Sequence, residues 1–156
     1  MIQSLPFTTS TNNRRIRDNF YSGGTVFSLT QTPLSPTNVK VFSQGLIKHY
    51  NFEYSIVGNI VTFFSPVPLN TATSIIYQCN QSHNRQVQNT IYHTTKSSIN
   101  SFDLEITPTN NLEEIYRQGI LLHPIQDYTI AGSVVNFVTS IPAETLLVVD
   151  LWKDIV

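Results

Sequence analysis

Residues 54–63 read YSIVGNIVTF, and the same pattern returns at residues 128–137 as YTIAGSVVNF. Each segment holds two short runs of β-branched and aromatic residues, separated by the pair Gly58-Asn59 or Gly132-Ser133. A two-residue loop with glycine in its first position favours a type II′ turn, which joins antiparallel strands. Both segments therefore predict a β-hairpin.

The turn also fixes which residues of the two strands lie opposite each other. Cross-strand partners share one face of a sheet, and the apolar residues of each hairpin fall on the same face. Four pairs should therefore be buried: Tyr54 with Phe63, Ile56 with Val61, Tyr128 with Phe137, and Ile130 with Val135. The opposite faces are more polar, so we expect them to be at least partly exposed to water.

The similarity extends outward from the hairpins. FSLTQTP at 27–33 returns as FDLEITP at 102–108, and VFSQG at 41–45 returns as IYRQG at 115–119. After the hairpins, TSIIYQC at 73–79 aligns with TLLVVDL at 145–151. The repeated unit is longer than that of solenoid proteins and occurs only twice, so it indicates a duplicated domain.

Within each copy, short runs rich in Val, Ile, Phe, Tyr and Thr alternate with Gly, Pro and Asn, and no segment keeps a helical period. We therefore predict an all-β chain with two tandem copies of a small antiparallel β-sandwich-like module. The expected parts are an extended N-terminal arm at 1–23, copy one at 24–79, a linker at 80–98 that could add an edge strand, and copy two at 99–156.

Composition restricts the partners. Hydrophobic residues make up 40% of the chain and charged residues 12%, and the net charge is −1. Such a chain has no long-range field for nucleic acid or an anionic membrane, so we expect neither as a partner. The N-terminus lacks the pattern of a secretory signal, and no apolar run approaches about 18 residues, so we expect a soluble protein made without export.

The sequence suggests no catalytic, cofactor or metal site. Cys79 is the single cysteine and is interpreted as an inert strand thiol. His49, His83, His93 and His123 lack the spacing of metal ligands, so we expect surface or loop histidines and no cofactor. No nucleophile elbow, phosphate-binding loop or dinucleotide-binding glycine pattern occurs.

Carboxylates could still support an enzyme of another kind, such as a depolymerase. Glu113 and Asp127 are the acids to test for that role, but the sequence does not bring them together with other acids or histidines. Asp127 and its counterpart Glu53 both precede the first hairpin strand, where we expect a strand-start hydrogen bond or an edge charge. We therefore predict that the chain is not an enzyme.

A module of about 50 residues buries too little surface to be robust alone, so we expect a homo-oligomer or a bound state. The arm carries a basic cluster suited to an acidic patch on a neighbouring protein, and aromatic residues outside the hairpin cores can serve as interface anchors. The predicted interface residues are Arg14, Arg15, Arg17, Phe20, Tyr21 and Trp152.

The string GILLHPIQDYTIAGSVVNFVTSIPAETLLVVDLW at 119–152 resembles a β module of bacteriophage tail-fibre and other virion structural proteins. Gly119, Asp127, Tyr128, Gly132 and Phe137 are among the residues that carry the resemblance, and copy one holds a looser version. The resemblance implies a non-enzymatic virion protein with other virion proteins as partners, placed at the tail or neck as an adaptor or fibre anchor. The alternatives are a capsid decoration protein and a receptor protein that binds host glycans.

Overall fold

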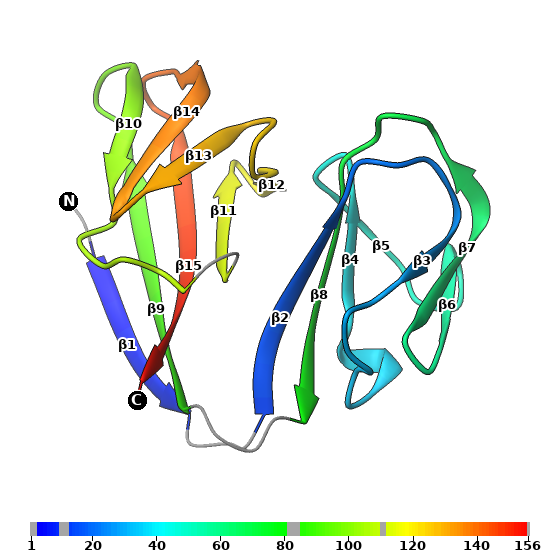
Figure 1. Ribbon diagram of the computed structural model, residues 1–156. Helices are drawn as coiled ribbons and strands as arrows, with labels where there is room; N and C mark the ends of the chain where they lie inside the picture. The colour runs from blue at the N-terminus through cyan, green and yellow to red at the C-terminus, as the bar shows by residue number, and fades with distance from the viewer. Residues whose placement is uncertain (1–2, 10–12, 81–84, 110–111, 156) are drawn as a thin grey trace. The chain divides into compact units, whose positions relative to one another are not determined.

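The computed structural model describes residues 3–9, 13–80, 85–109 and 112–155 (Figure 1). These residues form antiparallel β-strands and one short 3-10 helix, η1 (Pro36–Asn38). In this part of the chain no helix is long and apolar enough to cross a membrane. The predicted all-β fold class is confirmed.

The chain divides into two compact units, one formed by Asn12–His83 and the other by Met1–Thr11 together with Asn84–Val156. The first unit contains copy one of the repeat. Its larger sheet has the strand order β2 (Asn13–Phe20), β8 (Thr73–Asn80), β4 (Lys40–Ser43), β5 (Leu46–Lys48). Its smaller sheet has the order β3 (Gly24–Ser28), β7 (Ile60–Val67), β6 (Tyr54–Val57).

The second unit repeats these seven strands in the same order and adds one. Its larger sheet runs β1 (Gln3–Thr9), β9 (Arg85–Thr94), β15 (Leu146–Ile155), β11 (Glu113–Arg117), β12 (Ile120–Leu121). Its smaller sheet runs β10 (Ile99–Asp103), β14 (Val134–Ile141), β13 (Tyr128–Ala131). The two modules inferred from the sequence repeat are therefore present, each a sandwich of two antiparallel sheets.

Both predicted hairpins form in the expected register, and all four cross-strand pairs are present. Gly58 has φ 60° and Gly132 has φ 63°, whereas Asn59 and Ser133 are not among the residues with positive φ. This combination fits a type II′ turn, in which only the first loop residue needs the left-handed region. Ile130 departs from the prediction because it is only partly buried, although it packs against the core.

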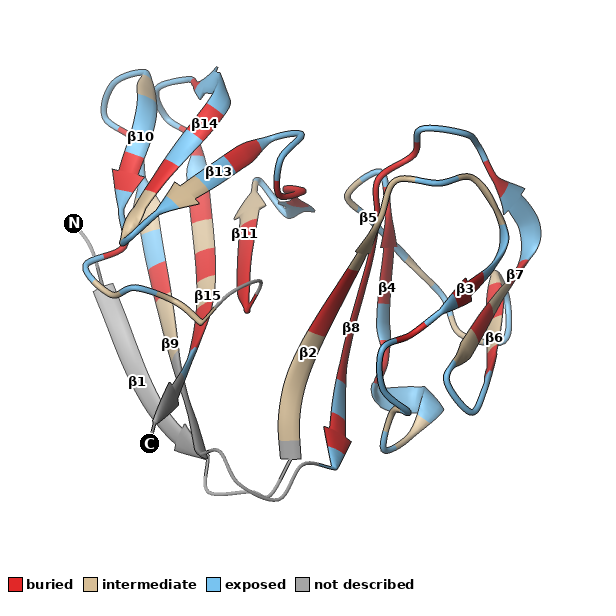
Figure 2. Ribbon diagram, in the orientation of Figure 1, coloured by how far each residue is buried: buried red, intermediate tan, exposed pale blue. Residues whose placement is uncertain are grey.

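Each copy has its own hydrophobic core, to which both of its sheets contribute. In copy one, Val61 of the smaller sheet and Ile75 of the larger sheet belong to one buried cluster, and both are fully buried. Val135 and Leu147 occupy the corresponding positions in copy two. Figure 2 shows how buried residues alternate with more exposed ones along β14, as expected for a strand with one face on a core.

The expected N-terminal arm was wrong, because residues 3–9 form β1 and residues 13–20 form β2. β2 pairs with β8 and turns Ile16, Asp18 and Phe20 to the core side, where Ile16 and Phe20 pack against the cluster. Asp18 breaks the apolar alternation in the sequence. The carboxylate is nevertheless satisfied, because the Tyr77 hydroxyl donates to it at 2.8 Å and the Thr30 backbone N–H at 2.9 Å.

The segment at 80–98, expected to be a linker that could add an edge strand, does contain a strand, β9. β9 is no edge strand, because it pairs with β1 on one side and β15 on the other. β9 is the counterpart of β2, so the structural copies span 13–80 and 85–155 and begin earlier than the sequence repeat indicated. The sequence offered little indication of this strand, because in its described centre Ile91 is the strongly apolar residue and its neighbours are Thr90 and Tyr92.

Candidate functional site: a pocket in the first module

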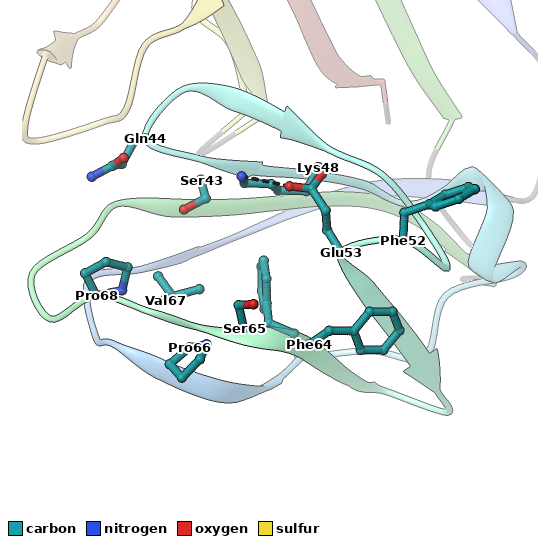
Figure 3. A pocket seen from close by; sticks show the side chains of 11 residues that line it. Ser43, Gln44, Lys48, Phe52, Glu53, Phe64, Ser65, Pro66, Val67 and Pro68 are labelled. Atoms are coloured by element: carbon teal, nitrogen blue, oxygen red, sulfur yellow. Dashed lines mark hydrogen bonds and ion pairs between the residues drawn. The ribbon is translucent and has the colours of Figure 1, made fainter.

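Copy one contains a pocket of about 230 Å³ at the open side of its sandwich (Figure 3). The β4–β5 turn forms one wall, and the second half of β7 forms the other. The turn is tight because Gln44 and Gly45 both have positive φ, at 54° and 75°. The lining residues are Ser43, Gln44, Lys48, Phe52, Glu53, Phe63, Phe64, Ser65, Pro66, Val67 and Pro68.

Two phenyl rings at the pocket stand out from the molecule. Phe52 precedes β6 and is 85% exposed, and Phe64 lies on β7 and is 56% exposed. Figure 3 shows both at the same end of the pocket, with Glu53 between them. Neither ring belongs to the core of copy one, so the fold itself does not account for an aromatic residue at either position.

A local ion pair holds the polar side of the pocket. Lys48 Nζ lies 3.0 Å from Glu53 Oε1, and the backbone N–H of His49 donates to Glu53 Oε2 at 2.8 Å. The His49 N–H and then the Lys48 ammonium stabilise the carboxylate, so they lower the pKa of Glu53. The pocket therefore holds one negative and one positive group that largely neutralise each other.

Copy two has a smaller pocket of about 140 Å³ at the equivalent place. Each of its lining residues stands 74 positions after a lining residue of the copy-one pocket: Arg117, Leu122, Asp127, Thr139 and Ile141. Asp127 corresponds to Glu53 and likewise accepts a backbone hydrogen bond, from His123 at 2.6 Å. The predicted strand-start hydrogen bond is thus confirmed for both acids.

The two pockets differ at the positions of both exposed phenyl rings and of one serine. Phe52 and Phe64 are replaced at the same offset by Gln126 and Val138, and Ser43 is replaced by the larger Arg117. Sequence reasoning missed Phe64 and did not connect Phe52 with Glu53. A position-by-position comparison of the two copies could have found both, because exposed aromatic residues in only one copy are not needed by the shared fold.

The predicted interface residues lie elsewhere and do not line this pocket. On β2, Arg14 and Arg15 are half-buried and Arg17 is buried; the Arg17 guanidinium donates to Ser74 Oγ at 3.1 Å. The Phe20 ring packs 5.1 Å from that of Phe27 at the copy-one core, which explains its presence without an external partner. The remaining two are half-buried Tyr21 after β2 and buried Trp152 on β15.

The cysteine, histidine and glutamate considered as candidates make contacts within the modules. Cys79 is buried in the copy-one core, and this burial raises the pKa of its thiol. His93 packs 4.8 Å from the ring of Phe102, and burial lowers the pKa of its imidazole. Glu113 accepts a hydrogen bond of 2.9 Å from the Tyr128 hydroxyl. His83 lies outside the described residues, within which no three His, Cys, Asp or Glu side chains are close enough to hold a metal ion.

The copy-one pocket combines exposed aromatic rings with neutralised polar groups, an arrangement suited to binding. Comparison with protein-family models and with curated proteins finds no match to this chain.

Proposed function

We propose that this chain is a non-enzymatic structural protein of a bacteriophage particle, where it acts as an adaptor at the tail or neck or as a fibre anchor. The resemblance of residues 119–152 to a virion β module supports the phage setting. The duplicated sandwich supports an assembly role, because two similar modules in one chain can contact two neighbours. Its partners are other virion proteins and further copies of itself.

The observation that carries the assembly role is the edge strand β5. β5 ends the larger sheet of copy one, and its residues Leu46 and Ile47 are 57% and 53% exposed. In copy two, Leu121 stands at the position of Ile47 and is only 3% exposed. An exposed apolar edge strand presents both backbone hydrogen-bonding groups and apolar side chains, so it is suited to pairing with another chain.

The hydrogen bonds of three acidic residues support a non-catalytic role. Asp18, Glu53 and Asp127 each accept hydrogen bonds from their own module, in ways that hold loops and strands in place. These contacts use the carboxylates to stabilise the fold. These three acids thus have structural explanations that do not require a substrate.

Immunogold labelling of purified particles with an antibody to this chain tests the proposal. Label at the tail or neck is the expected result. Label spread over the head would replace the adaptor role with capsid decoration. Particles without any label would overturn the virion assignment.

Substitution of the β5 edge tests the mode of assembly. Ile47→Lys places a charge on the strand that is proposed to pair, and should shift the protein to smaller species in size-exclusion chromatography with light scattering. Val138→Lys is the matched control, because Val138 is 64% exposed in copy two and lies off this edge. A wild-type chain that is a monodisperse monomer, or an equal effect of both variants, would contradict assembly through β5.

A further inference from the structure

We infer that the copy-one pocket is a carbohydrate site that holds one sugar ring of a glycan against Phe52 and Phe64. This function goes beyond the proposed assembly role and rests on different residues.

The pocket walls match a ligand that is apolar on one face and polar around its rim. Phe52 and Phe64 offer exposed aromatic rings, which attract the weakly positive C–H groups of a sugar face. Hydroxyls and an amide supply donors and acceptors from Ser43, Gln44 and Ser65. Sugar hydroxyls, which both donate and accept, can form hydrogen bonds with these three side chains.

The charge of the pocket favours a neutral ligand. Lys48 and Glu53 pair at 3.0 Å, and the second Glu53 oxygen already accepts the His49 N–H. A cationic or anionic side chain entering the pocket would have to compete with this pair and would lose its own hydration. A neutral polyhydroxyl ring can instead add hydrogen bonds to the pair without separating it.

The second half of β7, beyond the end of β6, disfavours an added peptide strand. The Phe64 N–H donates to the Glu53 carbonyl at 2.9 Å, so it points to the side on which β6 lies and is already used. Two residues later Pro66 points the same way, and it has no N–H to donate to a neighbouring strand. A single Tyr or Trp side chain of a protein partner would bring one polar group and leave most of the pocket's polar atoms without a partner, at a cost in free energy.

A glycan array probed with the full-length chain, followed by titration of the best sugar in solution, tests the inference. Phe52→Ala and Phe64→Ala remove exposed rings outside the core, so both variants should fold and should weaken the affinity by about tenfold. Val138→Ala is the matched control, because Val138 takes the place of Phe64 in copy two and is also exposed. Its affinity should equal that of the wild type.

Ser43→Arg provides a second variant that copy two already tolerates, since Arg117 stands at the equivalent position of the smaller pocket. The longer side chain should fill the copy-one pocket and abolish sugar binding. A wild-type chain that binds no glycan would overturn the inference, as would glycan binding that survives Phe52→Ala or Ser43→Arg. Particle labelling reports on the virion role separately, so either proposal can fail without the other.

Discussion

Replacing Tyr77 with phenylalanine tests whether the polar network in the copy-one core stabilises the module. Tyr77 is 1% exposed, and its hydroxyl donates to Asp18 Oδ2 at 2.8 Å and accepts from the Gln31 backbone N–H at 3.0 Å. A hydrogen bond to a charged group contributes about 1.5–3 kcal/mol to stability. Because Asp18 keeps its two bonds from Thr30, we expect Tyr77→Phe to lower the free energy of unfolding by about 2–3 kcal/mol.

Tyr54→Phe is the matched control, because it makes the same chemical change in the same unit. The Tyr54 hydroxyl donates only to the uncharged carbonyl of Val39, at 3.2 Å. Its loss should cost about 1 kcal/mol, the usual net value for a neutral hydrogen bond. The two variants should therefore differ by about 1–2 kcal/mol, and the difference reports the contribution of the Asp18 carboxylate.

Urea unfolding followed by circular dichroism measures both variants, with an unchanged m-value as the sign that only stability has changed. A double-mutant cycle of Tyr77→Phe with Asp18→Asn should give a coupling energy of about 1 kcal/mol or more. A loss of stability for Tyr77→Phe no larger than that for Tyr54→Phe, or a cycle without coupling, would show that the Asp18 carboxylate adds nothing to this hydrogen bond.

Three further predictions concern pH and packing. Burial raises the pKa of Tyr54 and Tyr77 from 10.0 to about 12, so above pH 10 the folded chain keeps protons that the unfolded chain has lost, and stability should fall as pH rises from about 10 to 12. In urea titrations at several pH values, the variant with both tyrosines replaced by phenylalanine should show a smaller fall. Ile75→Ala and Leu147→Ala should each destabilise their own unit by about 2–5 kcal/mol, and calorimetry in which both variants shift one common transition would contradict separate cores. Gly23→Ala should cost about 1–3 kcal/mol in thermal unfolding, because the new Cβ would lie 2.7 Å from the backbone N of Leu69; an unchanged melting temperature would show that the backbone relaxes freely.

The two hairpins and the duplication were predictable because their signals are local. A Gly-first pair between alternating runs determines both the turn and the register, and Tyr54 and Tyr128 then identify the buried face. The repeat of this pattern at nearly constant spacing predicts two modules of the same fold. None of these inferences requires knowledge of which strand lies beside another.

The strands β1, β2 and β9 were not predictable, because their formation depends on residues far away in the sequence. Asp18 occupies a core-facing position, and a carboxylate there is stable because Thr30 and Tyr77, the latter 59 residues away in sequence, donate to it. β1 pairs with β9 in the unit that β2 does not join, although β1 and β2 are adjacent in the chain. Pairing over such distances depends on long-range partners, so polar strands such as these resemble an arm and a linker when only the sequence is considered.

Local sequence signals were therefore enough to predict the fold class, the hairpin register and the presence of two modules, since turn chemistry and residue alternation act over a few residues. Tertiary structure alone decided the strand neighbours and the candidate site. Ser43, Glu53 and Phe64 become neighbours only when β4 and β7, which belong to different sheets, pack over one core. Apolar burial drives that packing, and it constrains the side chains that face the core while leaving those at the pocket rim free to differ between the copies.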